Sequence, residues 1–266
     1  MLALIKNEAY KMFKTKKIFV FMLVIFIYNL FPALEQVVGA IDESQIIING
    51  QTTPFYMLNF FLTNILPIFM IVSLADMITG EYISGTLKMP LLQPVSRTKL
   101  LAAKTLALVF VLASLLIFSL ILSYVMGTLI FGWGEQFSFQ EPEQAIQEAT
   151  VYSTTEGIMV TVASYLVSII PLIAFGMIIL FLALLFNSSG VTVGISIGFF
   201  IFLSILGEAV VAARPYLILN GFQMFKFLFV SQDINSFIST FIMTFIYGAG
   251  FFLASIYFFK KKDLLY

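Results

Sequence analysis

The chain has neither cysteine nor histidine. These absences exclude disulfide bonds, thiol nucleophiles, imidazole general bases and the common zinc sites. Charge is also scarce, because only 28 of the 266 residues are Asp, Glu, Lys or Arg, and the net charge is zero. A neutral chain has no long-range field that would attract nucleic acid, and its aromatic residues fall within apolar runs. We therefore expect no nucleic-acid partner, no bound metal and little catalytic chemistry.

Apolar residues dominate what is present. Hydrophobic residues make up 61% of the chain, 31 residues are phenylalanine and the mean hydropathy is +1.04. The surface of a soluble globule needs far more charge than this. Because a chain that crosses a bilayer must satisfy its backbone hydrogen bonds internally, the composition predicts an all-α integral membrane protein.

Long uncharged runs predict six transmembrane helices, since about 20 apolar residues cross the hydrocarbon core. The stretch Gly157–Gly207 is long enough for two spans, and the polar cluster Asn187–Gly190 predicts a tight turn between them. Pro67 and Pro171 predict kinks. The segment 215–232 is too interrupted for a crossing and predicts interfacial or re-entrant helices, and a short helix is expected after Pro142. The expected spans cover residues 18–38, 55–76, 105–133, 158–186, 190–212 and 234–259.

Residues 1–17 are basic, with apolar side chains at helical spacing, and predict an interfacial helix that leads into the first span. A signal peptide is the competing interpretation, because Val38 and Ala40 are small residues at plausible cleavage positions. The basic lead is longer than a typical signal-peptide n-region, which favours the interfacial helix.

The fifth span opens with Gly190, Gly194 and Gly198 at four-residue intervals. This spacing places three bare patches on one helical face and lets a second helix approach closely. The face predicts either packing within the chain or a subunit interface.

A polar segment, residues 80–104, interrupts two long apolar runs. Its charged residues are separated by Gly85, Pro90 and Pro94, and Leu87, Leu91 and Leu92 give it an apolar side. This pattern predicts a short amphipathic helix at the membrane surface on which a partner protein can dock. The alternative is a solvated connection whose basic residues only fix orientation.

The distribution of charge predicts the orientation. If both termini are cytoplasmic, the inner segments hold twelve of the fourteen Lys and Arg residues, and the outer face holds only Arg214 and Lys226. Such a bias follows the positive-inside rule. Both termini and residues 80–104 are therefore expected in the cytoplasm.

The polar segment carries a family resemblance. Gly80-Glu81, Gly85-Thr86-Leu87-Lys88, Leu91-Leu92, Pro94-Val95-Ser96-Arg97 and Lys99-Leu100-Leu101-Ala102-Ala103-Lys104 resemble the loop after the second span of bacterial ABC exporter permeases of the type-2 class. Within that class, they are similar to bacitracin and lantibiotic immunity subunits. Lys6-Asn7-Glu8 is similar to the N-terminal helix of the same proteins, and the six-span plan also matches.

This resemblance implies that residues 80–104 form a coupling helix that docks on a separate ATP-binding subunit. Its contact residues would be Glu81, Gly85, Thr86, Lys88, Pro94, Arg97 and Lys99, with Gly85 as the bend. It also implies a bacterial cell-membrane permease that works as a dimer with a second, identical or homologous copy and with two ATPase subunits, which would hold the ATP and Mg²⁺. The chain has no GxxxxGK[ST] loop of its own and is not expected to be an enzyme by itself.

Other interpretations of the sequence remain. Glu81 could pair locally with Lys88 or Arg97, and Arg97 could extend to lipid phosphates. A stand-alone transporter or channel is the alternative function, although such proteins usually carry ionisable residues at mid-membrane, and Asp76 and Glu208 lie at span ends. A membrane-embedded protease would need a histidine or two mid-span aspartates. Spans lined by apolar, Ser and Thr side chains favour an amphiphilic cargo, such as an antimicrobial peptide or a lipid-like compound, within a lipid environment.

Overall fold

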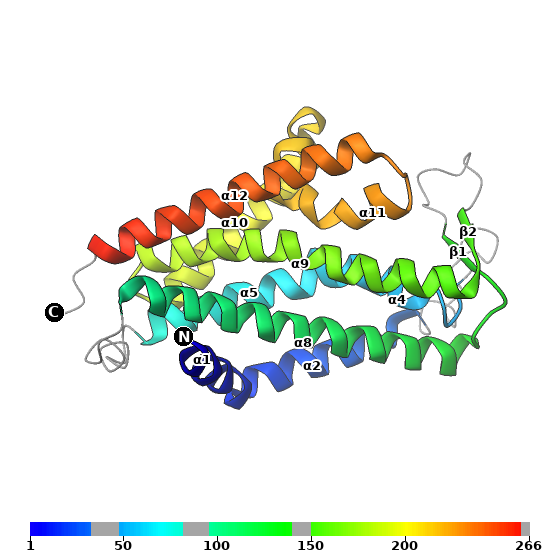
Figure 1. The fold of residues 1–266 in the computed structure, drawn as a ribbon, viewed down its shortest axis with the longest axis horizontal. Coiled ribbons are helices and arrows are strands. Elements are labelled where there is room, and N and C mark those ends of the chain that lie inside the picture. The colour runs from blue at the N-terminus through cyan, green and yellow to red at the C-terminus, as the bar shows by residue number, and fades with distance from the viewer. Residues whose placement is uncertain (33–47, 82–95, 140–149, 262–266) are drawn as a thin grey trace.

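The computed structural model describes residues 1–32, 48–81, 96–139 and 150–261 as an elongated bundle of helices (Figure 1). The longest helices run along its long axis, whereas α1 is seen nearly end-on and so lies across them. In chain order the elements are α1 (Leu2–Lys14), α2 (Lys16–Tyr28), α4 (Thr53–Phe60), η1 (Phe61–Ile65), α5 (Leu66–Ala75), η2 (Asp76–Gly80), α8 (Arg97–Phe131), β1 (Phe137–Phe139), β2 (Thr150–Tyr152), α9 (Thr154–Leu185), α10 (Ser189–Ala209), η4 (Val211–Tyr216), η5 (Ile218–Gln223), α11 (Met224–Phe229) and α12 (Ile234–Lys261).

Five stretches of the described chain are long and apolar enough to cross a membrane, which makes this a multi-pass membrane protein. The expected first span, residues 18–38, is described only in part. Its described helix α2 has 13 residues, and at 1.5 Å per residue this is too short to cross a core about 30 Å thick. The sixth span therefore stays a prediction. The five stretches are Thr53–Gly80, Arg97–Phe131, Thr154–Leu185, Ser189–Ala209 and Ile234–Lys261.

Helix α8 begins eight residues before the start that the sequence predicts. Ser96 is its N-cap, and its hydroxyl accepts a hydrogen bond from the backbone N–H of Lys99. Arg97, Lys99 and Lys104 consequently lie on the long helix itself rather than on a separate surface helix. Helix α9 also begins earlier than expected, after a capping box.

The span Thr53–Gly80 contains two π-helical turns, η1 and η2, which the sequence analysis does not predict. η1 ends two residues before Pro67, where the proline lacks an N–H and its ring crowds the preceding turn. A widened π turn can accommodate a proline placed just after it, and the kink expected at Pro67 stays a prediction. η2 closes the span immediately before Glu81.

The segment between α10 and α12, which the sequence predicts to be interfacial or re-entrant, forms short helices that pack on α9 and α12. Its position relative to the membrane stays a prediction. Gly221 in η5 is so close to Pro171, near the middle of α9, that a Cβ at this glycine would lie 2.9 Å from the proline Cβ. The hydroxyl of Tyr247 in α12 donates to the carbonyl of Tyr216 at 2.9 Å. α11 then leads back toward the start of α9, where the Tyr152 hydroxyl donates to the carbonyl of Phe229.

One end of the bundle carries a small antiparallel hairpin, β1 with β2, which the all-α prediction does not include. The short helix expected after Pro142 falls outside the described residues. Beside the hairpin, Asn49 shapes the turn that precedes α4: its Oδ1 accepts from the backbone N–H groups of Gln51 and Thr52. The Asn49 and Gln51 amides donate to the carbonyls of Gln136 and Gly134. We call this the hairpin end.

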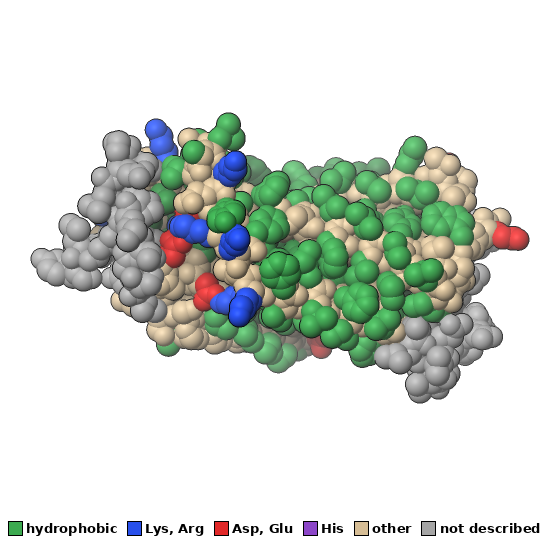
Figure 2. Space-filling model, turned by 90° about the horizontal axis from the view of Figure 1, so that it is seen from below, with side chains coloured by type: hydrophobic (Ala, Val, Ile, Leu, Met, Phe, Trp, Pro, Cys, Tyr) green, Lys and Arg blue, Asp and Glu red, His purple; other side chains and the backbone are tan. Residues whose placement is uncertain are grey.

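The opposite end, which we call the charged end, carries most of the described charges. Figure 2 shows basic and acidic side chains gathered there, beside a wide surface of apolar side chains. The buried core lies between α4, α5, α8 and α9. Many apolar residues of α8, α10 and α12 point outward, which is expected where helices face lipid tails.

Candidate functional site

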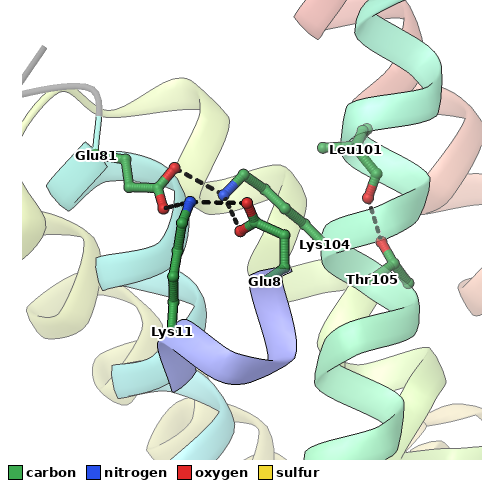
Figure 3. Close-up of polar contacts among 6 residues, drawn as sticks. All are labelled: Glu8, Lys11, Glu81, Leu101, Lys104 and Thr105. Carbon is green, nitrogen blue, oxygen red and sulfur yellow. Dashed lines mark hydrogen bonds and ion pairs between the residues drawn. The ribbon is translucent and has the colours of Figure 1, made fainter. Parts of the chain in front are cut away.

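Four charged side chains from three separate elements meet at the charged end (Figure 3). Glu8 and Lys11 come from α1, Glu81 follows η2, and Lys104 lies on α8. The Lys104 ammonium lies 2.7 Å from Glu8 Oε2 and 2.7 Å from Glu81 Oε2. The Lys11 ammonium lies 2.8 Å from Glu8 Oε1 and 3.1 Å from Glu81 Oε1. We call this closed, electrically neutral ring the four-charge cluster.

The cluster is most deeply buried where α1 meets α8, and it becomes more exposed toward Glu81 and Lys11. The Lys104 side chain is 1% exposed and the Glu8 side chain 2%, whereas Glu81 is 18% exposed and Lys11 42%. Charges this deep are tolerated only when they are paired and hydrogen-bonded. Burial alone would raise the pKa of Glu8, but the ammonium groups of Lys104 and Lys11 outweigh it, and the pKa lies below its ordinary value. Desolvation lowers the pKa of Lys11, but the hydrogen bond that Lys11 donates to Glu8 and the charge of Glu81 outweigh it and raise the pKa.

Local sequence explains how these groups reach one another. Glu8 lies on the apolar face of α1, between Ile5 and Met12 at helical spacing, and this face packs on α8. Lys11 follows Glu8 by one helical turn, so the two side chains share a face. The ring of charges therefore fixes α1 to the end of one span and to the start of the next.

A second polar contact at the same end joins three more elements. Lys17, at the start of α2, forms an ion pair with Asp76, the first residue of η2. Asp76 Oδ1 also accepts a hydrogen bond from the hydroxyl of Ser189, at the start of α10. Deeper in the bundle, the Thr79 hydroxyl donates to the carbonyl of Ala183. These bonds connect η2, the last turn of the span Thr53–Gly80, to α2, α9 and α10.

The structure places the predicted coupling residues in three different settings. Gly85, Thr86, Lys88 and Pro94 lie outside the described residues. Glu81 belongs to the four-charge cluster, and its described partners are Lys11 and Lys104 rather than Arg97.

Arg97 and Lys99 occupy the first turn of α8. The Arg97 guanidinium donates to the carbonyls of Phe259 and Lys260, so it binds the last turn of α12. Arg97 therefore has a partner inside the chain, and its contact with lipid phosphates stays a prediction. Lys99 is exposed.

Sequence reasoning did not single out Glu8 and Lys104 as site residues. One signal was present: Glu8 falls among the apolar positions of an amphipathic helix, where an acidic residue needs a partner. The identity of that partner could not be read, because Lys104 is 96 positions away along the chain.

The glycine face of α10 does not pack within the described chain. A Cβ at Gly190, Gly194 or Gly198 would meet no atom within 4 Å, and all three glycines are exposed. Packing inside the chain, one of the two predicted roles, is therefore wrong for the described residues. The subunit interface stays a prediction.

Two residues of the four-charge cluster lie within the region in which the chain matches a known family, and two precede it. A family model described as a protein of unknown function (DUF2705) matches residues 18–265. The chain belongs to the DUF2705 family. All five candidate spans of this DUF2705 protein lie inside the matched region, as do Glu81 and Lys104, whereas Glu8 and Lys11 precede it. No curated protein matches the chain.

The charges of the four-charge cluster balance one another. Its two carboxylates are neutralised by two ammonium groups at hydrogen-bond distance, which leaves no poised nucleophile or base among these four residues. A neutral, closed ring of charges strongly resists losing one member. The ring therefore holds α1 against the end of η2 and the start of α8.

Proposed function

We propose that this DUF2705 protein is the membrane-spanning permease subunit of an ATP-driven ABC exporter in a bacterial cell membrane. Its partner would be a separate ATP-binding subunit that carries ATP and Mg²⁺, present in two copies, with a second permease completing the complex. The cargo would be an amphiphilic or hydrophobic compound, such as an antimicrobial peptide or a lipid-like molecule. Both termini and residues 82–95 would face the cytoplasm.

The observation that carries this proposal is the position of the four-charge cluster. Glu81 directly precedes residues 82–95, and Lys104 lies on the first turns of the helix that follows them. The salt bridge between them holds the two ends of that loop together, and Glu8 attaches both ends to α1. A force applied to the loop would therefore reach two spans and α1 at once, which is what nucleotide-driven closure of a partner below the membrane requires.

The distribution of charge among the described residues favours a permease driven by a separate ATPase over a stand-alone transporter. Proton- or ion-coupled transporters place ionisable groups near mid-membrane, on the substrate path. Asp76, Glu81 and Lys104 instead lie together at the charged end of the bundle. The stand-alone transporter or channel remains the alternative, and it predicts transport without nucleotide.

Two experiments test the proposal. The chain has no cysteine, so single cysteines at Lys99 and Glu135, both exposed and at opposite ends, give clean topology probes. A membrane-impermeant maleimide on intact cells should label Glu135→Cys and not Lys99→Cys, and the reverse pattern would reject the proposed orientation.

The second experiment is affinity purification of the full chain from its native membrane in mild detergent. We expect a stoichiometric protein with a GxxxxGK[ST] loop and ATPase activity, and Glu81→Ala should weaken its retention while the chain still inserts. Glu135→Ala, which removes an exposed carboxylate at the hairpin end, is the matched control and should leave this retention unchanged. Purification of the chain without any such protein, under conditions that preserve its fold, would count against the proposal.

A further inference from the structure

A cleft opens beside the four-charge cluster, between α1 with the start of α2 on one side and α5 with η2 on the other. Its volume is about 200 Å³. A water molecule takes up about 30 Å³ of liquid, so the cleft has room for a small polar group with a few attached carbons. Apolar walls come from Met12, Ile18, Phe69 and Met77, and charged side chains from Lys17 and Asp76 among others.

Buried apolar side chains form much of the cleft floor, beside the buried Glu8 of the four-charge cluster, and the more exposed Lys17 and Asp76 stand at the mouth. Ile18 and Phe69 are 3% and 1% exposed, whereas the side chains of Lys17 and Asp76 are 45% and 40% exposed. An occupant would therefore place carbon atoms against the floor and ionic groups at the rim. Inorganic ions have no apolar part, and the floor would give them no favourable contact.

The mouth lies at the ends of two candidate spans, where a membrane-spanning bundle is expected to meet lipid headgroups. Asp76 is in the last turns of Thr53–Gly80 and bonds to Ser189 at the start of α10, and Lys17 lies in the first turn of α2. Away from this level, toward the hairpin end, the surface is largely apolar (Figure 2). Because the chain is a multi-pass membrane protein, the molecules that surround this mouth at the highest concentration are bilayer lipids.

Three other charged residues of the lining, Glu8, Lys11 and Glu81, are already paired within the four-charge cluster. The Lys17–Asp76 ion pair at the mouth therefore sets the charge type of the occupant. An anion that took Lys17 would leave the Asp76 carboxylate without its cation, and a cation that took Asp76 would leave Lys17 without its anion. A zwitterion satisfies both, because its phosphate pairs with the ammonium of Lys17 while its own ammonium pairs with the carboxylate of Asp76. Every charge then remains paired, and no net charge is transferred into the cleft.

We propose that this cleft is a binding site for the zwitterionic headgroup of an aminophospholipid of the phosphatidylethanolamine type. The primary ammonium hydrogen-bonds to Asp76, the two methylenes contact the apolar wall at Ile18 and Phe69, and the phosphate lies at Lys17. A primary ammonium has three N–H donors for a carboxylate, whereas the trimethylammonium of phosphatidylcholine has none. The site goes beyond the proposed permease function and does not depend on it.

The test is native mass spectrometry of the purified full chain in mild detergent. Phosphatidylethanolamine, phosphatidylcholine and phosphatidylglycerol with identical acyl chains are added at equal concentration. We expect phosphatidylethanolamine to be retained about ten-fold more than either of the other two lipids, the ratio typical of a hydrogen bond to a charged group. Equal retention of the three lipids, or preferential retention of phosphatidylglycerol, overturns the proposal.

Variants locate the binding. Asp76→Asn removes the carboxylate charge, and we expect it to abolish the preference for phosphatidylethanolamine over phosphatidylcholine. Ser73→Leu, a substitution at another residue of the cleft wall, should fill the cleft and lower phosphatidylethanolamine retention while leaving Asp76 in place. Glu135→Gln removes an exposed carboxylate near the hairpin end and serves as the matched control.

The result of the variants is decisive in either direction. Loss of the preference in Asp76→Asn and Ser73→Leu, with wild-type retention in Glu135→Gln, supports the site. Unchanged lipid preference in a folded Ser73→Leu variant overturns it even if Asp76→Asn proves unstable. Because no ATP-binding subunit is present in this measurement, its outcome is separate from that of the permease proposal.

Discussion

Replacing Lys104 by methionine removes the ammonium that joins Glu8 to Glu81 while keeping a side chain of similar length on α8. The Glu8 carboxylate, 2% exposed, would then keep only its contact with Lys11. Removing one partner of a buried ion pair typically costs 3–5 kcal/mol. Lys11 remains at 2.8 Å from Glu8, and Glu81 is 18% exposed and can rehydrate, so the low end applies.

We therefore expect Lys104→Met to lower the free energy of unfolding by about 3 kcal/mol, which is a change of about 140-fold in the unfolding equilibrium. For a chain of this size the melting temperature should fall by about 6–12 °C. The measurement is thermal unfolding of the purified protein in detergent, followed by intrinsic fluorescence or circular dichroism. Lys99→Met, an exposed lysine on the same helix, is the matched control and should change the melting temperature little.

A double variant separates lost charge pairing from lost packing. Glu8→Gln with Lys104→Met removes one charge of each sign and leaves Lys11 paired with Glu81 at 3.1 Å. If the loss comes from an unpaired buried carboxylate, the double variant should be more stable than Lys104→Met alone. Losses that simply add, or a Lys104→Met variant as stable as Lys99→Met, would refute the electrostatic explanation of the cluster.

Three further predictions follow from the same structure. The folded-state pKa of Glu8 is lowered, so the stability that its charge contributes is present above the unfolded pKa of 4.5 and is lost as the pH falls through the folded-state pKa. A pH series of melting temperatures should show this loss at acid pH in the wild type and a weaker loss in Glu8→Gln. Parallel curves for the two proteins would contradict this role of Glu8. Arg97→Glu removes the donor to the last carbonyls of α12 and should cost about 1.5 kcal/mol, with faster hydrogen exchange at the end of α12; unchanged exchange there would show that these bonds are dispensable. Gly127→Ala should destabilise the fold by about 1–3 kcal/mol through overpacking, because its Cβ would lie 2.7 Å from the Thr53 Cβ. Gly194→Ala, with open space around it, should leave the melting temperature of the monomer unchanged. Equal changes in melting temperature for the two variants would contradict the packing described at these positions.

The sequence predicts well what depends on local composition. Long uncharged runs located five spans, since apolar residues that must stay in lipid leave a continuous signal. The turn at Asn187 and the short, interrupted helices of residues 215–232 also follow from local signals, polar clusters and glycine.

Features that depend on distant partners could not be predicted. The Lys104–Glu8 contact joins residues 96 positions apart, and the Arg97–Phe259 contact joins residues 162 apart. Nothing in the neighbourhood of either residue specifies which partner it meets. The early start of α8 was missed for a different reason, because a charged first turn was assigned to the preceding loop although Ser96 is a good N-cap.

Spacing alone also could not decide which helical faces are covered. The glycines of α10 have the periodicity of a packing face, yet they are open in the described chain, while the isolated Gly127 lies tightly against Thr53. Periodicity identifies a face, and the tertiary arrangement decides what lies opposite it.

The most direct test of the permease proposal is transport by the full chain reconstituted in vesicles together with the ATP-binding protein that co-purifies with it. A fluorescently labelled lantibiotic peptide serves as the probe, with ATP and Mg²⁺ or a non-hydrolysable ATP analogue on the side of the vesicle that exposes Lys99. We predict movement of the peptide away from that side only with hydrolysable ATP, and its loss in Glu81→Ala. Equal movement with no nucleotide, or uphill transport by the chain alone, would contradict an ATP-driven permease.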